Sequence, residues 1–304
     1  MDYFSFIENA IDFIEEKLLD SFSIEDVASE IGFSIPHFYR IFSAIVGETP
    51  KNYIRKRRIS IGALMLRETN LNICDVAFEI GFESHEVFIR AFKKIYGVAP
   101  KNSLLLDSLP LYEKFDVMRK KRLYEKDVLL LDIKIIIKNS FKIIGKTTNL
   151  NQAEQVENNL IDKFINEFNQ EKSHFPTVND KDKIYSLYEY DANSIHKDDE
   201  NINYLYTLGV EYKETDDIPE GFIIKEIPQS KYALFIYDTK EKTLNGESIS
   251  SLKYEGEPIT NVYDYIDGVW VLNSGYTLSD NPDFEIRNTN SDVIIEYYIS
   301  VEDK

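Results

Sequence analysis

Apolar residues recur at a helical spacing in the first third of the chain. They fall at i, i+3, i+4 and i+7 within residues 38–45, and again within residues 88–95. This spacing predicts two amphipathic helices, each with one buried face, and places the remaining positions of both helices towards the outside. The inward-facing residues are Phe38, Ile41, Phe42 and Ile45 in the first helix and Phe88, Ala91, Phe92 and Ile95 in the second.

Both helices belong to a segment that occurs twice. Ile24–Phe33 and Ile73–Phe82 share eight identical residues, and the similarity continues into the amphipathic helices after one inserted residue. Each copy predicts a helix, a tight turn at a glycine and a second helix, at about 23–46 and about 72–96. This is the plan of a helix-turn-helix DNA reader, and two readers on one chain can enter two major-groove segments without dimerising.

A long helix at about Pro50–Arg67 is expected to connect the two readers. It begins with a proline, which is tolerated in a first helical turn, and it carries the basic run Arg55–Arg58. That run either contacts DNA phosphates or forms a solvated helix face. Lys51 and Arg55 are our candidates for phosphate contacts in this helix, as Lys93 and Lys94 are in the second reader.

The period of the hydrophobic pattern changes after residues 107–126, which we expect to form a linker that is helical near its end. Alternating apolar residues then predict strands, and two amphipathic segments predict helices. The order strand-strand-helix-strand-strand occurs twice, which predicts an α+β domain of two related halves over residues 127–304. The predicted strands are Val128–Ile137, Phe141–Thr147, Ile184–Tyr190, Tyr204–Tyr212, Gly221–Ile227, Tyr232–Asp238, Asp283–Asn288 and Val293–Val301, and the predicted helices are Gln152–Asn169 and about Pro258–Val271.

The net charge of −18 is distributed unevenly. Residues 51–101 carry ten basic and five acidic side chains, whereas residues 180–304 carry 11 basic and 27 acidic ones. Because salt screens charges beyond about 8–10 Å, the local field decides which partner a surface attracts. We therefore expect the first third to bind DNA and a domain boundary to follow it.

Composition narrows the remaining function classes. We expect a cytoplasmic protein, because no apolar run is long enough for a membrane span and the first residues lack a basic signal-peptide region. The single Cys74 excludes a disulfide framework. No residue cluster has the spacing of a metal, cofactor or catalytic site, so we expect a binding protein rather than an enzyme.

The second copy reads Ile73-x-x-Val76-Ala77-x-x-x-Gly81-Phe82, followed by Phe88-x-Arg90-x-Phe92-Lys93-x-x-x-Gly97-x-x-Pro100. With this pattern, residues 1–106 resemble the DNA-binding domain of the AraC/XylS family. The resemblance implies an all-α domain whose recognition helices are Ser34–Ile45 and Ser84–Ile95. The positions it implies for contacts with base edges are Pro36, Tyr39 and Arg40 in the first helix and His85, Glu86 and Arg90 in the second.

These candidate positions differ in what they can offer DNA. Pro36 has no donor, so Arg40 is expected to be the main reader of the first helix, through guanine O6 and N7. His37 also faces outwards and is included among the DNA-binding candidates. Glu86 either accepts a hydrogen bond from cytosine or repels phosphate.

Three motifs in the second domain carry a second resemblance. They are Ile227-Pro228-x-x-Lys231-Tyr232-Ala233, Trp270-Val271-x-x-Ser274-Gly275-Tyr276 and Asn281-Pro282-Asp283-Phe284-Glu285. With them, residues 127–304 resemble the GyrI-like effector-binding domain. This resemblance implies a site in which Glu285 meets a ligand between aromatic walls, although Arg287 stands where relatives often carry an aromatic residue. The aromatic candidates are Tyr206, Tyr232, Trp270, Tyr276 and Phe284.

We therefore expect a monomeric or homodimeric transcription regulator, of the activator type, whose partners are double-stranded DNA, a small-molecule effector and RNA polymerase. An acidic domain rich in tyrosine favours a lipophilic effector with a positive charge. Two alternatives remain for the second domain. It is either a hydrolase or a module that sequesters drugs or a protein partner, with DNA binding secondary.

Overall fold

The computed structural model describes residues 2–101, 109–124, 129–151, 160–171, 182–190, 203–212, 218–254, 257–288 and 293–303. They form two compact units, Asp2–Lys126 and Asp127–Lys304. The first unit is helical and the second is built on an antiparallel sheet. The predicted fold class, an all-α domain followed by an α+β domain, is confirmed.

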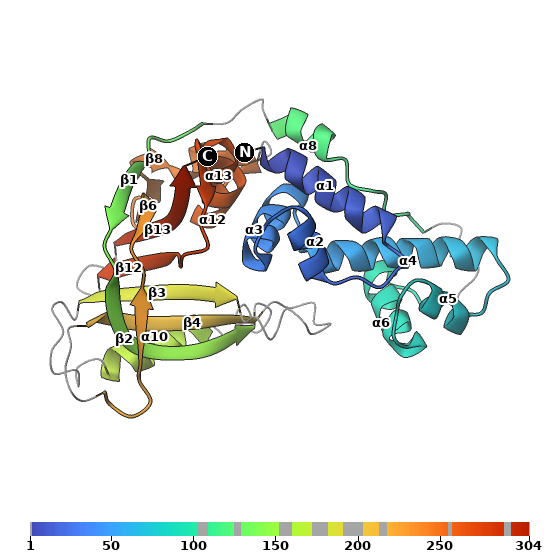
Figure 1. Cartoon of the computed structure of the whole chain (residues 1–304), viewed down its shortest axis with the longest axis horizontal. Helices are drawn as coiled ribbons and strands as arrows, with labels where there is room; N and C mark the ends of the chain where they lie inside the picture. Colours follow the sequence, from blue (N-terminus) through green and yellow to red (C-terminus); the bar gives the residue numbers. More distant parts are fainter. Residues whose placement is uncertain are drawn as a thin grey trace. The chain divides into compact units, whose positions relative to one another are not determined.

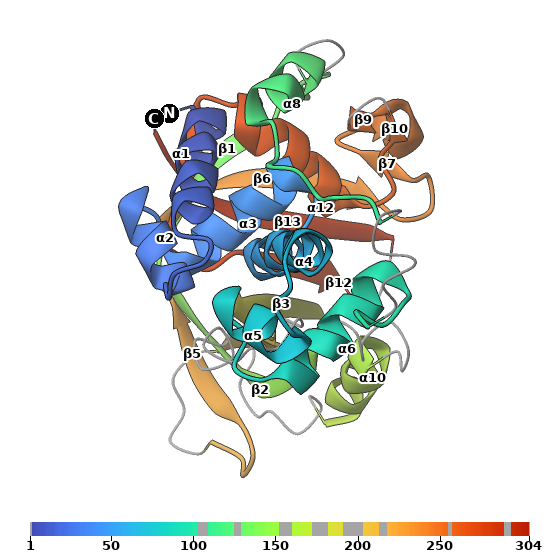
Figure 2. The same cartoon turned by 90° about the vertical axis from the view of Figure 1, so that its right-hand side faces the viewer.

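The helical unit consists of two helix pairs joined by one long helix. Figure 1 shows the long helix α4 leading from the pair α2–α3 to the pair α5–α6, and Figure 2 looks along it. The pairs pack on α4 through different cores, of which the second includes Ile59, Val76, Phe88 and Phe92. The helices are α1 (Tyr3–Glu16), α2 (Ile24–Glu30), α3 (Ile35–Val46), α4 (Pro50–Glu68), α5 (Ile73–Glu79), α6 (His85–Tyr96) and α8 (Val117–Tyr124).

Local sequence determines where these helices begin and turn. Ser23 and Asp26 form a capping box, because each side chain bonds to the other's backbone N–H and satisfies donors that lack helical partners. Gly32 and Gly81 adopt φ values of +72° and +79° in the two turns, a conformation that glycine reaches without steric cost. The predicted turns are therefore confirmed at both copies.

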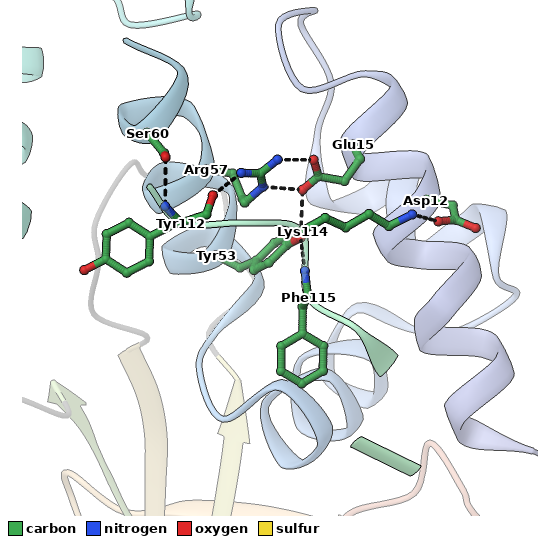
Figure 3. Close-up of polar contacts among 8 residues, drawn as sticks. All are labelled: Asp12, Glu15, Tyr53, Arg57, Ser60, Tyr112, Lys114 and Phe115. Carbon is green, nitrogen blue, oxygen red and sulfur yellow. Dashed lines mark hydrogen bonds and ion pairs between the residues drawn. The ribbon is translucent and has the colours of Figure 1, made fainter. Parts of the chain in front are cut away.

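Residues 109–116 form an extended segment that packs against α1 and α4 (Figure 3). The backbone N–H of Tyr112 donates to Ser60 Oγ at 2.9 Å, and the Tyr112 carbonyl accepts from Arg57. The backbone N–H of Phe115 donates to Tyr53 Oη, which in turn donates to Glu15. Because α8, which follows, also contacts α1 and α3, the described part of the predicted linker belongs to the helical unit.

The second unit contains a single curved sheet and a separate two-stranded ribbon. The main sheet has the order β5-β2-β4-β3-β12-β13-β6-β7-β8, with β1 paired to β6 and β11 paired to β13. Its strands are β1 (Lys134–Lys138), β2 (Phe141–Asn151), β3 (Lys183–Tyr190), β4 (Asn203–Tyr212), β5 (Ile223–Ile227), β6 (Ser230–Asp238), β7 (Thr243–Leu244), β8 (Glu247–Ser248), β11 (Tyr276–Leu278), β12 (Phe284–Asn288) and β13 (Ile294–Asp303). The ribbon pairs β9 (Lys253–Tyr254) with β10 (Glu257–Pro258).

The two halves of this unit exchange their first strands. By sequence β1 belongs to the first half, but it pairs with β6 of the second half. Strand β5 belongs to the second half and pairs with β2 of the first. The halves meet where β3 pairs with β12, at the centre of the sheet.

Each half carries a helical segment. In the first half, α10 (Leu160–Glu171) packs on β2, β3 and β4 through Phe168 and its neighbours. In the second, Phe235 of β6 contacts the rings of Tyr265 and Trp270. The face of the sheet opposite to α10 and Trp270 holds a separate cluster that includes Tyr185, Tyr232, Phe284 and Tyr298. The helical segment of the second half is α12 (Val262–Tyr265), the π-helical turn η3 (Ile266–Trp270) and α13 (Val271–Asn273), and a short 3-10 turn η2 (Ile249–Ser251) precedes it.

Two predicted elements begin later in the structure than predicted, and one is described only in part. The strand predicted from Val128 begins only at Lys134, and the helix predicted from Pro258 begins at Val262, because Pro258 pairs with Lys253 in the ribbon. The first part of the helix predicted over Gln152–Asn169 lies outside the described residues. The short strands β7–β11 are not apparent from the hydrophobic pattern, since two or three residues carry no measurable period.

Candidate nucleic-acid interface and effector site

Helix α6 has one buried face and one exposed charged face. Phe88, Ala91 and Phe92 are buried, whereas the side chains predicted to face DNA are exposed. Ser84 caps the helix by accepting from the backbone N–H of Val87, and Gly97 ends it in the left-handed region. The exposed residues are His85, Glu86, Arg90, Lys93 and Lys94.

Glu86 has an additional role at the start of α6. Hydrogen bonds from its own backbone N–H and from Ser84 lower the pKa of its carboxyl group, with smaller contributions from His85 and Arg90. Its Oε1 also lies 3.3 Å from His85 Nε2. An acid in the first turn favours the helix because it faces the positive end of the helix dipole. Glu86 therefore stabilises the N-terminal end of α6.

Helix α3 differs from the sequence-based prediction at one position. Tyr39 was expected to face outwards, but it is 2% exposed. It lies next to Phe42 around the helix, at the edge of the apolar stripe, and its ring contacts that of Phe38 at 6.4 Å. An edge position can turn a ring inwards, and burial raises the pKa of the Tyr39 phenol. Its predicted exposure is thus wrong.

The other DNA-binding candidates on α3 differ in solvent exposure, whereas those on α6 are all exposed. Pro36 is exposed and Arg40 is half-buried. The His37 ring stacks on Phe33 with centroids 4.3 Å apart, and its Nε2 lies 3.3 Å from Tyr3 Oη. His37 therefore anchors the helix-turn-helix internally, in addition to any role at DNA.

Part of the basic run on α4 points into the protein. Arg57 forms two hydrogen bonds of 2.7 Å with the Glu15 carboxylate. Arg58 donates to the carbonyls of Leu18 and Asp20 at 2.8 and 2.9 Å. Both arginines hold helix α1 and the chain after it against α4, so neither is placed as a phosphate contact. Lys51 and Arg55 are half-buried and stay predictions.

In the sheet unit, the most unusual buried group is the carboxylate of Glu285. Glu285 lies on β12 opposite Ser186 of β3 and Tyr297 of β13, where the two halves meet. Its side chain is 3% exposed. A buried carboxylate needs charged or hydrogen-bonding partners, because desolvation otherwise disfavours its charge.

Both oxygens of the Glu285 carboxylate have partners. Arg287 donates to Oε2 from Nη2 at 2.9 Å and from Nε at 3.3 Å. Tyr263 of α12 donates to Oε1 at 3.0 Å. Burial alone would lower the pKa of Arg287, but the Glu285 carboxylate outweighs it and leaves this pKa raised. The Glu285 carboxylate is therefore already paired within the protein.

Four tyrosines surround this ion pair. The rings of Tyr188 and Tyr206 lie 4.7 Å apart, and those of Tyr263 and Tyr297 lie 5.4 Å apart and perpendicular to each other. Burial raises the pKa of all four phenols, and the charge of Glu285 raises each further. These side chains stay neutral and offer hydroxyl groups and ring faces around two opposite charges. We refer to Glu285, Arg287, Tyr188, Tyr206, Tyr263 and Tyr297 as the Glu285 site.

Comparison with known proteins decides the family. Residues 27–104 match a helix-turn-helix domain family, and residues 134–301 match a family described as an integron-associated effector binding protein. The transcriptional activator AarP of Providencia stuartii is 36% identical over 104 residues, which cover 34% of this chain and 77% of AarP. The chain belongs to the AraC-type transcription regulators and carries an effector-binding domain.

Two further relatives match the regulator over stretches of different length. The right origin-binding protein of Escherichia coli K12 is 26% identical over 246 residues, 78% of this chain and 80% of that protein. YbfP of Bacillus subtilis, described as an uncharacterized HTH-type transcriptional regulator, is 40% identical over 100 residues. That match covers 33% of the regulator and only 34% of YbfP.

The predicted ligand residues of the regulator do not all lie together. Tyr206 belongs to the Glu285 site, but Tyr232 and Phe284 lie on the opposite face of the sheet, in the cluster with Tyr298. Successive strand residues point to opposite faces, so Phe284 and Glu285 cannot share a site on one face. The structure separates these two aromatic residues from the acid.

Trp270 and Tyr276 form a third group. Their rings stack at 6.0 Å, and Trp270 also packs on Phe235 at 5.2 Å. Tyr276 pairs with Asp303, six positions along β13 from Tyr297, the neighbour of Glu285. Both residues thus contribute to the core of the second half and not to the Glu285 site.

The sequence-based prediction missed Tyr188, Tyr263 and Tyr297 as members of the Glu285 site. Tyr188 and Tyr206 are cross-strand neighbours, as are Tyr297 and Glu285, so strand register would have identified two of the missed residues, Tyr188 and Tyr297. Among the described residues, no group of three or more His, Cys, Asp or Glu is placed to hold a metal ion. Within the same ranges, no helix has both the length and the apolar character to cross a membrane.

Proposed function

We propose that the regulator reads DNA with α3 and α6 and that a small-molecule effector binds at the Glu285 site. Effector binding then changes either the occupancy of a promoter or the recruitment of RNA polymerase. Family membership supports DNA binding and transcription regulation. The observation that carries the effector assignment is the ion pair of the buried Glu285 with the half-buried Arg287 inside an aromatic shell.

The exposed face of α6 supports the DNA assignment. Arg90 has the length and the donors to reach guanine O6 and N7, and Lys93 and Lys94 follow it by about one turn. The free amides at a helix N-terminus suit a phosphate, and the N-terminal residues of a recognition helix commonly meet base edges. On α3, Pro36 and Arg40 remain the residues we propose for base contacts.

The energetics of the Glu285 site support a binding function over a purely structural one. A buried ion pair loses hydration, and replacing it by apolar residues of similar size is often neutral or even stabilising. Packing alone therefore gives little reason to place two opposite charges among four tyrosines. Aromatic walls with a few convergent polar groups and perturbed pKa values are typical of small-molecule sites.

The proposal can be tested with the full-length regulator. Genome-wide occupancy identifies a bound DNA fragment, and fluorescence anisotropy then measures the affinity for that fragment with and without members of a lipophilic compound library. We expect at least one compound to change the dissociation constant. Tyr263→Ala should abolish this response, because Tyr263 bonds to Glu285.

Tyr276→Ala is the matched control. It removes another tyrosine of the same unit, in contact with Trp270 and not with Glu285. The response should survive in this variant. Loss of the response in Tyr276→Ala together with its survival in Tyr263→Ala would move the effector site to the Trp270 group.

A further inference from the structure

The charges of the Glu285 site are already balanced within the protein. Glu285 Oε2 accepts two hydrogen bonds from Arg287, and Oε1 accepts one from Tyr263. A cationic effector would therefore meet a neutral pair and not a free carboxylate. It would also have to displace a guanidinium that is tethered two residues away on the same strand.

The two charged side chains differ in their access to solvent. The side chain of Glu285 is 3% exposed, whereas that of Arg287 is 35% exposed. An incoming molecule therefore reaches the guanidinium first. Glu285 lies beneath it and holds it in position.

Arg287 retains donors that no partner uses within the described part of the chain. A guanidinium has five N–H groups in a planar fork, and only Nε and Nη2 of Arg287 donate to Glu285. The Nη1 group is left to bind an acceptor from outside. A carboxylate gains more from such a donor than a neutral oxygen does, because hydrogen bonds between opposite charges are stronger.

The surroundings favour an apolar body attached to that anion. Tyr188 and Tyr206 lie close enough to influence the pKa of Arg287, and their rings contact each other at 4.7 Å. Phe164 of α10 extends this surface, with its ring 6.0 Å from Tyr206. Aromatic or aliphatic groups gain from contact with such rings.

We propose that Arg287 makes the Glu285 site selective for lipophilic carboxylates over lipophilic cations. The inference rests on the proposed effector site and specifies its ligand class. It reverses the preference for a positive charge that the acidic composition favours. Long-range repulsion by the acidic unit slows the approach of an anion, but this repulsion is screened within about 8–10 Å at physiological salt.

Three probes with one carbon skeleton and different charges provide the test. Isothermal titration calorimetry on the full-length regulator compares phenylbutyrate, phenylbutanol and phenylbutylamine. We expect phenylbutyrate to bind about tenfold or more tightly than phenylbutylamine, with the alcohol between them. Equal affinities, or tighter binding of the amine, would overturn the inference.

Variants of Arg287 separate its charge from its geometry. Arg287→Gln should invert the order, because the carboxylate probe loses its donor and the Glu285 charge becomes available to the amine. Arg287→Lys should keep the preference for the carboxylate at reduced affinity, since the charge remains and the fork is lost. Lys253→Gln removes an exposed positive charge from the same unit and should leave all three affinities unchanged.

The outcomes distinguish this inference from the proposed function. If the order of affinities is the same in Arg287→Gln as in the unmodified regulator, Arg287 does not determine selectivity, while the effector site stands. If none of the three probes binds to the folded protein, the inference is overturned. The compound library measured on the bound DNA fragment then shows whether an effector site exists at all.

Discussion

At the scale of single residues, the basic run of α4 shows how similar side chains acquire different roles. Lys56 pairs with Glu48 at 2.7 Å, Arg57 forms an ion pair with Glu15, and Arg58 donates to three backbone carbonyls. A planar guanidinium can satisfy several acceptors at fixed angles, which a lysine ammonium cannot do in the same way. Arginine is therefore used where α4 holds other segments, although the sequence presents all of them as one basic patch.

The Glu15–Arg57 pair leads to a prediction about stability and pH. Burial raises the pKa of Glu15, but hydrogen bonds from Arg57 and Tyr53 outweigh it and leave this pKa below its ordinary value of 4.5. A carboxyl group with a lowered pKa stabilises the fold above its unfolded-state pKa and loses this contribution as the pH falls through the folded-state value. Glu15→Gln should thus cost about 1.5–3 kcal/mol at neutral pH, measured by urea denaturation.

The difference between Glu15→Gln and the unmodified protein should shrink as the pH falls from about 4.5 through the lower folded-state pKa of Glu15, because below that pKa both side chains are neutral. Glu16→Gln is the control, since Glu16 is an exposed neighbour on the same helix. A cost that stays constant down to acidic pH would show that Glu15 acts through its shape and not through its charge.

On α6, arginine and lysine should affect DNA binding differently. Arg90→Ala should cost about 1–3 kcal/mol at one base position of the bound fragment and little on unrelated DNA. Lys93→Ala should weaken binding to all sequences and reduce the slope of log affinity against log salt by about one. Anisotropy titrations at several salt concentrations measure both effects. Uniform weakening by Arg90→Ala would instead identify Arg90 as a phosphate contact.

At the scale of elements, the two helix-turn-helix copies provide a natural comparison at their turns. Gly32 and Gly81 have nearly the same φ, but a Cβ added to Gly32 would meet nothing within 4 Å. A Cβ on Gly81 would lie 3.0 Å from Arg58 Nη1. The same turn is therefore free of neighbours in one copy and packed against a fixed arginine in the other.

This difference predicts unequal costs for the same substitution. Gly32→Ala should cost about 1–2 kcal/mol, the strain of the left-handed backbone conformation. Gly81→Ala should cost more, because Arg58 must also move while it is bound to the carbonyls of Leu18 and Asp20. Chemical denaturation of the two single variants provides the comparison, and equal costs would mean that Arg58 yields freely.

The sequence predicts elements well where the hydrophobic period is long. Helices α3 and α6 and the glycines of their turns follow from local spacing, and the strands β2, β3, β4, β6 and β13 lie close to the predicted ranges. The exchange of β1 and β5 cannot be predicted from local spacing, because residues far apart in the sequence determine which strands pair. The ion pair of Glu285 is also not predicted, because Arg287 was noted in the sequence only as a departure from relatives.

Which residues reach the Glu285 site depends on the sheet as a whole. Phe284 precedes Glu285 in the sequence, and Tyr232 belongs to one of the three motifs of the same domain. Side chains alternate along β12, and β13 pairs with both β12 and β6, so Phe284 and Tyr232 lie on the face of the sheet opposite to Glu285. Tyr188 comes from β3, almost one hundred residues before Glu285 in the sequence. Tyr263 comes from α12, about twenty residues before Glu285. Composition identifies a tyrosine-rich domain, but only the assembled sheet identifies which tyrosines meet.

At the scale of the whole molecule, each unit has its own core, yet the sheet unit joins two cores through shared strands. Clusters around Phe168 and around Phe284 lie on opposite faces, and β2 and β3 contribute to both. Because β1 completes the second half and β5 completes the first, we expect neither half to unfold alone. The sheet unit should behave as one cooperative structure.

Hydrogen exchange of a core variant tests this cooperativity. Phe168→Ala removes a fully buried ring from α10 and should cost about 3–5 kcal/mol. Exchange measured by mass spectrometry should then rise in β6 and β13 of the second half as well as in β2, β3 and β4. An increase confined to the first half would contradict a single cooperative unit.

The strand exchange also bears on how such a domain could have arisen. A chain of half this length, with the order of β1, β2, α10, β3 and β4, would lack the neighbour that its second strand requires. Two copies of it could each supply the missing strand to the other, and the result would be an intertwined dimer with a twofold axis between the two central strands. Fusing the copies into one gene frees the two positions nearest that axis to diverge. Glu285 and Ser186 are paired on these two strands, so the ligand site that we propose would differ between its two sides, and a ligand would bind there in one orientation.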